Sequence, residues 1–179
     1  MRAFIAIEVP EEVKERVLAV SERLKTESIV LVKKEAMHIT LHFLGDITDS
    51  EAEKTKEAMN SVTRKPFEAS LSGISCFTPN FIRVIFADVA EGKEEVSAIH
   101  RELSVPLSGA GIRIEREEFI PHLTIARVKY AADRGKLLDL IKRNSAAEFG
   151  AFAVDSIVLK KSLLSNAGPL YTELYERKL

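Results

Sequence analysis

This sequence has little cysteine, no long apolar run and almost no net charge. Its single cysteine, Cys76, excludes an internal disulfide, and no cysteine cluster indicates a structural zinc site. The apolar N-terminal run Ala3–Ile7 reaches Glu8 too soon for a signal peptide or a membrane-spanning helix, so we expect a cytoplasmic protein. At a net charge of −1, any affinity for nucleic acid has to come from a local basic surface.

One short pattern occurs twice in the chain. His38–Leu41 and His122–Ile125 both read histidine, apolar, threonine, apolar, and each lies in an apolar run that predicts a strand. Side chains two residues apart in a strand point to the same face, so each segment sets an imidazole beside a hydroxyl. A single pair of this kind is more often structural than catalytic, but two copies at equivalent places favour catalysis.

The order of the predicted strands and helices also repeats along the 179 residues. A helix follows each histidine-containing strand, and the next strand opens at Phe67 and at Phe149, nearly as far apart as the two histidines. We interpret this spacing as an internal duplication, with two lobes related by a pseudo-twofold axis and both motifs at one central cleft. The predicted strands cover residues 3–9, 29–32, 37–44, 67–74, 81–89, 119–128, 148–154, 157–164 and 171–177. Four helices are predicted. The first follows Pro10, the second begins with a capping box at residues 48–51, the third runs through residues 96–103 and stops at Pro106, and the fourth includes residues 137–141.

Two imidazoles on opposite sides of one phosphorus atom have the chemistry for phosphodiester hydrolysis. One removes a proton from the attacking water, and the other protonates the leaving oxygen. The threonine hydroxyls are suited to donate to the non-bridging oxygens, where charge grows in the transition state. Since no spaced carboxylate cluster accompanies either histidine, the pattern indicates no metal site.

The two motifs resemble those of a known family. The runs 38–45 (HITLHFLG) and 119–127 (FIPHLTIAR) resemble the two motifs of the two-histidine (2H) phosphoesterase superfamily. The opening RAFIAI and the late GPLY are similar to landmarks of one branch, the RNA 2′,3′-cyclic phosphodiesterases, also called 2′-5′ RNA ligases. The chain departs from the usual motifs at His42, where lysine is common, and at Ile125, which replaces leucine.

The resemblance implies an α+β fold and an activity. The fold has two pseudo-symmetric lobes, each an antiparallel sheet with helices on its outer face, around a central cleft, with residues 1–179 forming a single bilobal domain. The enzyme is expected to open RNA 2′,3′-cyclic phosphate ends to 2′-phosphomonoesters without a metal or other cofactor. By analogy His38 is the general acid, His122 is the general base, and Thr40 and Thr124 hold the phosphate, although sequence alone does not separate acid from base.

Other side chains are weaker candidates for substrate binding. Arg127 is out of phase with His122, but its long side chain can reach a phosphate, and Arg2 can do the same. Tyr171 either stacks on a nucleobase or is a buried strand residue. Phe43 is out of phase with the first motif, so we expect it in the core unless a bulge turns it outward.

The remaining polar residues have less specific interpretations. His42 either lines the cleft or is an exposed histidine, and His100 is expected on the surface of a helix. Several basic residues either form a rim that guides RNA or are ordinary solvated charges. The acidic residues 115, 117 and 118 would weaken the positive charge of such a rim. The candidate rim residues are Lys33, Lys34, Arg113, Arg116, Lys129, Lys160 and Lys161.

Three functions are therefore compared. The first is hydrolysis of cyclic phosphate ends by a monomer whose partners are RNA ends or nucleotides. The second is a ligase that joins a 2′,3′-cyclic phosphate to a 5′-hydroxyl at the same site. The third is a binding module for RNA ends that has lost catalysis, against which the two intact motifs argue.

Overall fold

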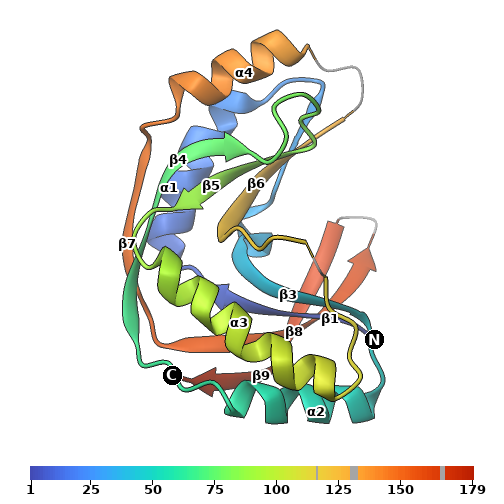
Figure 1. Ribbon diagram of the computed structural model, residues 1–179. Coiled ribbons are helices and arrows are strands. Elements are labelled where there is room, and N and C mark those ends of the chain that lie inside the picture. The colour runs from blue at the N-terminus through green and yellow to red at the C-terminus, as the bar shows by residue number, and fades with distance from the viewer. Residues whose placement is uncertain (116, 130–132, 166–167) are drawn as a thin grey trace.

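The computed structural model describes residues 1–115, 117–129, 133–165 and 168–179 (Figure 1). Of the residues discussed above, Arg116 lies outside this part of the chain. The strands are β1 (Arg2–Glu8), β2 (Ile29–Leu31), β3 (His38–Asp46), β4 (Phe67–Cys76), β5 (Val84–Val89), β6 (His122–Val128), β7 (Glu148–Val154), β8 (Ser156–Ser165) and β9 (Gly168–Lys178). The helices are α1 (Glu11–Ser21), α2 (Asp49–Asn60), α3 (Lys93–Gly109) and α4 (Arg134–Arg143), with short 3₁₀ turns at Glu22–Leu24 and Lys34–Ala36.

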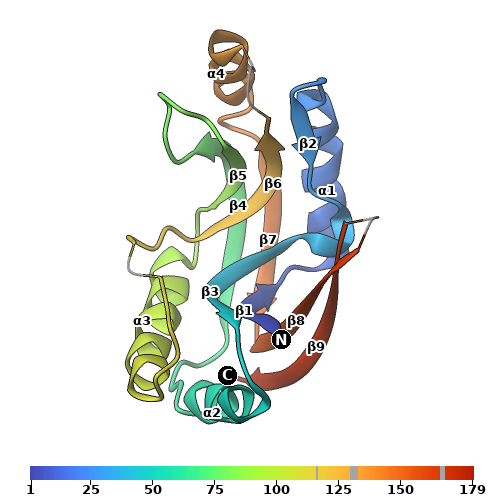
Figure 2. The ribbon, with the colours of Figure 1, turned by 90° about the vertical axis from the view of Figure 1, so that its right-hand side faces the viewer.

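The strands form one antiparallel sheet whose order is symmetric about its centre. Eight strands follow the order β7-β4-β5-β6-β3-β1-β8-β9, and β2 pairs with β6. Each lobe holds one histidine strand at the junction, β6 or β3, and three further strands outward from it (Figures 1 and 2). The predicted arrangement of two pseudo-symmetric antiparallel lobes is therefore confirmed, although the sheet runs unbroken from one lobe into the other.

Two of the described helices, α1 and α3, exchange between the lobes. Helix α1 follows β1 but packs on β7 and β6 of the other lobe, and α3 follows β5 but packs on β3. Helices α2 and α4 lie at opposite ends of the molecule, against β9 and β4 respectively (Figure 1). This exchange covers the outer faces with helices from both halves of the chain and leaves the opposite face of the β3–β6 junction for the site.

Local sequence signals predict the start of α2 but not the end of α3. Thr48 and Glu51 form the predicted capping box at the start of α2, each side chain accepting from the other residue's backbone N–H. The predicted stop at Pro106 is wrong, because α3 continues to Gly109. Proline removes only one helical hydrogen bond here, and the fully buried Leu103 and Leu107 hold the last turn against the core.

Part of the repeat seen in the sequence does not follow the symmetry. Strands β4 and β7, which begin near the two phenylalanines used above, are neighbours in the same lobe, with Phe67 opposite Val154. By position in the sheet, β4 corresponds to β8 and β7 to β9. The predicted breaks at Gly45-Asp46 and Gly168-Pro169 also lie within strands, at the end of β3 and the start of β9.

Within the residues described above, no helix combines the length and apolar character needed to cross a lipid bilayer.

Candidate active site

The two His-x-Thr motifs meet where β3 pairs with β6. Ile39 and Leu123 are register partners in this antiparallel contact, and both are fully buried on the core face. In each strand a half-buried histidine and a half-buried threonine flank this buried residue, so both point to the opposite face of the sheet. In this register each histidine lies opposite the threonine of the other motif. In a regular antiparallel pair, the diagonal neighbours on one face, here the two histidines, lie about 7–8 Å apart.

A bulge in β3 changes which side chains face the site. Ala6 pairs with Thr40 and Ile5 with His42, so Leu41 is the extra residue. After the bulge the alternation is shifted by one residue. Phe43 is 47% exposed on the face of the motif, whereas His42 is only 3% exposed on the core face. The expectation that Phe43 packs in the core is wrong, and the bulge is the physical reason.

Strand β6 has the same irregularity at the equivalent place. Phe86 pairs with Thr124 and Ile85 with Ala126, which leaves Ile125 as the extra residue. The shift turns Arg127 outward to the face of the second motif. The predicted mismatch in phase between Arg127 and its histidine is thus removed by the backbone, not only by the length of the side chain.

The imidazole of His38 lies among aromatic rings. It stacks on Phe4 with centroids 4.6 Å apart at 22°, and it meets the ring of Tyr171 edge-on at 5.3 Å. Its Nδ1 atom is buried, and it makes no hydrogen bond to the described residues. Burial lowers the pKa of His38 to about 4, and the carboxylate of Glu8 opposes this shift.

The imidazole of His122 is held by a hydrogen bond. Its Nδ1–H donates to the carbonyl of Ile120 at 2.7 Å, and its ring lies 4.8 Å from Phe77 and 5.1 Å from Phe86. Burial lowers the pKa of His122, while the hydrogen bond and the nearby Asp88 oppose the shift. Since Nδ1 carries the proton in this neutral tautomer, Nε2 keeps its lone pair and is the acceptor.

A carboxylate on the neighbouring strand faces each histidine. Glu8 of β1 is the register partner of His38, and Asp88 of β5 is the register partner of His122. These two positions correspond under the pseudo-twofold axis, because β1 and β5 occupy equivalent places in the sheet. Neither residue can be predicted from the sequence, because the sequence does not show which strands pair or in which register.

The two carboxylates differ in their partners. Glu8 is bound by Lys160 and lies 3.5 Å from Lys14, and both lysine side chains are largely buried. Lys34, in turn, bonds to Glu11 and Glu15. Lys34 and Lys160 therefore pair with carboxylates of this chain, whereas a basic rim would need their charges free to attract RNA. At Asp88, burial raises the pKa, and Lys93 and His122 partly offset the shift.

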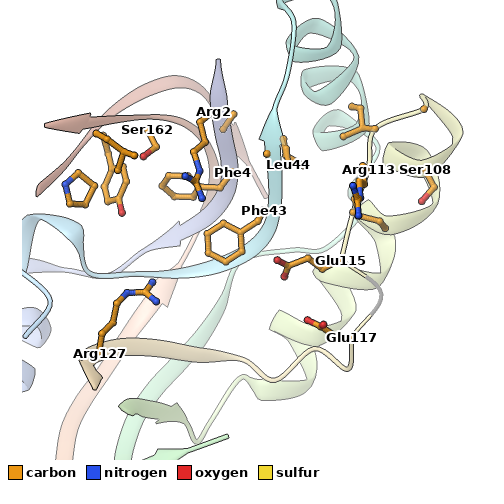
Figure 3. Close-up of a pocket in the computed structure, with 18 residues that line it drawn as sticks. Arg2, Phe4, Phe43, Leu44, Ser108, Arg113, Glu115, Glu117, Arg127 and Ser162 are labelled. Atoms are coloured by element: carbon orange, nitrogen blue, oxygen red, sulfur yellow. The ribbon is translucent and has the colours of Figure 1, made fainter. Parts of the chain in front are cut away.

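A groove of about 1320 Å³ adjoins the histidine pair. Its walls include Phe4 and Tyr171, which contact the ring of His38, but the two histidines do not themselves line it. Figure 3 shows Arg127 from β6 and Phe43 from β3 directed into this space, with Arg2 beside Phe4. The predicted substrate-binding residues Arg127 and Tyr171 thus lie on the groove wall, and Arg2 joins them.

The other two histidines do not lie where the sequence analysis expected them. His42 is neither in the cleft nor exposed, because the bulge turns it into the core, where burial lowers its pKa to about 4. His100 is half-buried and stacks on His42 at 4.0 Å, so the prediction of a surface histidine is wrong. Its helix neighbours Arg101 and Glu102 suggested solvent, but its own face of α3 packs on β3.

The described part of the chain contains no group of three or more histidine, cysteine, aspartate or glutamate residues arranged to hold a metal ion. The pairing of β3 with β6 offers a proton acceptor, a second imidazole and two hydroxyl donors on one face of the sheet. It matches the demands of acid–base chemistry on a phosphate ester.

Comparison with known proteins gives a consistent assignment. The sequence matches the 2′-5′ RNA ligase superfamily over residues 9–164. It is 38% identical over 178 residues to the RNA 2′,3′-cyclic phosphodiesterase of Methanocaldococcus jannaschii, covering 98% of this chain and 99% of that protein. The fold matches the crystal structure of TT0787 of Thermus thermophilus with a TM-score of 0.81 at 28% identity, covering 100% of this chain and 98% of the other.

A second structure matches at lower identity. The crystal structure of E. coli LigT complexed with 3′-AMP gives a TM-score of 0.84 at 19% identity, covering 99% of this chain and 97% of the other, and supports the fold. The family match covers most of this chain, and one relative is identical to it at more than a third of the aligned positions. This chain therefore belongs to the 2′-5′ RNA ligase superfamily.

Proposed function

We propose that this protein hydrolyses RNA 2′,3′-cyclic phosphate ends to 2′-phosphomonoesters by general acid–base catalysis. The observation that carries the proposal is the pairing of Ile39 with Leu123, which brings both His-x-Thr motifs to one face. The curated relatives named RNA 2′,3′-cyclic phosphodiesterase, 38% and 34% identical over nearly the whole chain, support the choice of substrate. The expectation of a cytoplasmic monomer stays a prediction.

His122 is the proposed general base. Its bond to the Ile120 carbonyl keeps the proton on Nδ1, and burial keeps the ring neutral near pH 7. The lone pair of Nε2 then takes a proton from the water that attacks phosphorus. This geometry supports the base role independently of the family resemblance.

His38 is the proposed general acid, which protonates the 3′ leaving oxygen. In the free enzyme its pKa is about 4, so the ring has to gain a proton when substrate binds. A phosphate anion about 4 Å away, at an effective dielectric of about 20, stabilises the protonated ring by ~4 kcal/mol. The arriving substrate therefore raises the pKa of His38 and favours the protonated ring that a general acid needs.

The phosphate is held by groups from both lobes. The hydroxyls of Thr40 and Thr124 donate to the non-bridging oxygens, which gain charge in the transition state. The guanidinium of Arg127 binds the same phosphate or the next one along the RNA. Tyr171 and the exposed ring of Phe43 line the space in which the terminal ribose and base lie.

A direct assay tests this proposal. The protein is incubated with EDTA and an oligoribonucleotide that ends in a 2′,3′-cyclic phosphate, and the product is identified by chromatography. We expect a 2′-phosphomonoester from the wild type and loss of product in His38→Ala and His122→Ala. Full activity in both variants would overturn the proposal, and a joined product formed in excess 5′-hydroxyl RNA would favour the ligase.

A further inference from the structure

A stack of three rings lies behind the bulge of β3, on the core side of the sheet. The ring of His100 on α3 lies between His42 and Phe119, with centroids 4.0 Å from each. It is nearly parallel to both, at 15° to His42 and 2° to Phe119. The mechanism proposed above uses none of these rings, although His42 is buried and His100 and Phe119 are half-buried.

The two histidines join α3 to β3 by reciprocal hydrogen bonds. Nδ1–H of His100 donates to the carbonyl of Leu41 at 2.8 Å, and Nε2–H of His42 donates to the carbonyl of His100 at 3.0 Å. The hydroxyl of Ser104 donates to the same His100 carbonyl at 2.8 Å. Burial lowers the pKa of both rings, so both are neutral near pH 7, and each hydrogen bond selects one tautomer.

The Leu41 carbonyl has a counterpart in the other lobe. Leu41 is the extra residue of the β3 bulge, and Ile125 is the extra residue of the β6 bulge. The carbonyl of Ile125 accepts from the backbone N–H of Val32 at 2.8 Å. Both bulges therefore have a partner for the carbonyl of the extra residue. The β6 bulge uses main chain, whereas the β3 bulge depends on a side chain that mutation can remove.

The far end of the stack reaches the second motif. Phe119, which covers the outer face of the His100 ring, directly precedes Ile120. The carbonyl of Ile120 is the group that orients His122. One side chain, His100, thus contacts the backbone that shapes the first motif and the segment that orients the second.

We propose that His100 is a positioning residue for both halves of the active site. Its Nδ1–H holds the bulge that turns Phe43 into the groove, and its ring holds the Phe119–Ile120 segment that orients His122. The kinetic test of this inference rests on the proposed function. It assigns the hydrogen bond to Leu41 to substrate binding and the ring contact with Phe119 to the chemical step.

Two substitutions separate the two contacts. His100→Phe keeps a ring between His42 and Phe119 but removes the donor to Leu41. His100→Asn keeps a donor near the place of Nδ1 but removes the ring. Val105→Ala, at a position 78% exposed on the same helix, is the control. Thermal unfolding of each variant is measured first, so that kinetics are compared only at temperatures where all are folded.

The kinetics are measured with the oligoribonucleotide that ends in a 2′,3′-cyclic phosphate. We expect His100→Phe to raise KM at least about fivefold with kcat little changed, since a buried carbonyl loses its partner next to Phe43. We expect His100→Asn to lower kcat with a smaller change in KM. In a Phe43→Ala background, His100→Phe should raise KM no further. Equal changes in both parameters for both variants, or additive effects with Phe43→Ala, would overturn the inference.

A readout without turnover separates this inference from the proposed function. The ¹⁵N chemical shifts of the His122 ring report its tautomer, and hydrogen exchange at residues 40–44 reports the bulge. We expect His100→Asn to change the ¹⁵N shifts of the His122 ring and His100→Phe to change hydrogen exchange at residues 40–44. Val105→Ala should change neither measurement. If the wild type does not cleave the cyclic phosphate, the proposed function fails, while these two measurements still decide the role of His100. Unchanged shifts and exchange in both variants would contradict it.

Discussion

In the β6 half of the site, a backbone carbonyl orients the histidine, and the carboxylate of Asp88 faces it. In the β3 half, Nδ1 of the histidine makes no such bond to any residue that the structure describes, and the carboxylate that faces it is paired with two lysines. The backbones of the halves match closely, down to one bulge three residues after each histidine. The two halves therefore share the geometry of their strands, whereas the side chains around each imidazole differ.

The difference suits a site that needs one proton acceptor and one proton donor. The ring of His122 is fixed in the tautomer that leaves Nε2 free to accept. The ring of His38 is largely buried, and burial lowers its pKa to about 4, so the ring is neutral near pH 7. Two identical halves would give two equivalent imidazoles, and acid and base would not be distinguished before substrate binds.

Loss of either imidazole should give the largest effect and should separate the two roles. We expect His38→Ala and His122→Ala each to lower kcat by roughly 10²–10⁴ on an RNA cyclic phosphate. A cyclic phosphodiester analogue with a nitrophenolate leaving group needs no general acid. On this analogue the loss in His38→Ala should shrink, whereas the loss in His122→Ala should remain.

The measurement is kcat for both substrates, with folding checked by circular dichroism. If the analogue restores activity in His122→Ala but not in His38→Ala, the acid and base are exchanged. If it restores neither variant, leaving-group protonation is not the role of either ring.

The two residues that follow the bulges offer the next comparison. Phe43 and Arg127 occupy equivalent places, but one has an apolar surface and the other a charge. We expect Phe43→Ala to raise KM by roughly 5–100-fold through lost base stacking, nearly independently of salt. Arg127→Ala should raise KM by a similar factor and weaken its salt dependence, because an ion pair with phosphate is lost.

Steady-state kinetics at low and high salt, about 50 and 500 mM, test this pair. Arg127→Lys serves as a matched control, since it keeps the charge but loses the planar, bidentate geometry. Equal salt dependence in the alanine variants would contradict the assignment of stacking to one position and phosphate binding to the other.

The bulges explain why the sequence predicts the placement of the motif histidines and threonines better than that of their neighbours. The histidines and threonines precede each bulge, so simple alternation assigns them to one face correctly. His42, Phe43 and Arg127 follow the bulges, where alternation fails, and the predicted placements of His42 and Phe43 are wrong. A bulge depends on hydrogen bonds from other elements, here from His100 and Val32, which no local pattern encodes.

Removing the charge of either facing carboxylate should have a smaller effect on kcat. The two substitutions should change the width of the pH profile of kcat in opposite directions. Each carboxylate raises the pKa of its histidine, so its removal lowers that pKa. An acid has to be protonated, so Glu8→Gln should move the alkaline limb of the kcat profile to lower pH by roughly one unit. A base has to be neutral, so Asp88→Asn should move the acidic limb to lower pH. The first variant narrows the profile and the second widens it.

The pH dependence of kcat checks this comparison, with Glu53→Gln on the exposed face of α2 as control. A shift of the same limb in both variants would mean that the two carboxylates act on one histidine, or on the field of the whole site. The pairing of Glu8 and Asp88 with the histidines also marks a limit of sequence reasoning. Periodicity predicts that β1 and β5 are strands, but not that they flank β3 and β6, because pairing order is set by packing of the whole chain.

The most direct test is a crystal structure with a ribonucleoside 2′-monophosphate, the product of the proposed reaction. We predict that one phosphate lies between the two lobes, with the Nε2 atoms of His38 and His122 on opposite sides and each within about 3.2 Å of a phosphate oxygen. The hydroxyls of Thr40 and Thr124 should bond to the non-bridging oxygens. A phosphate that contacts only one of the histidines, or lies elsewhere in the groove, would contradict the account.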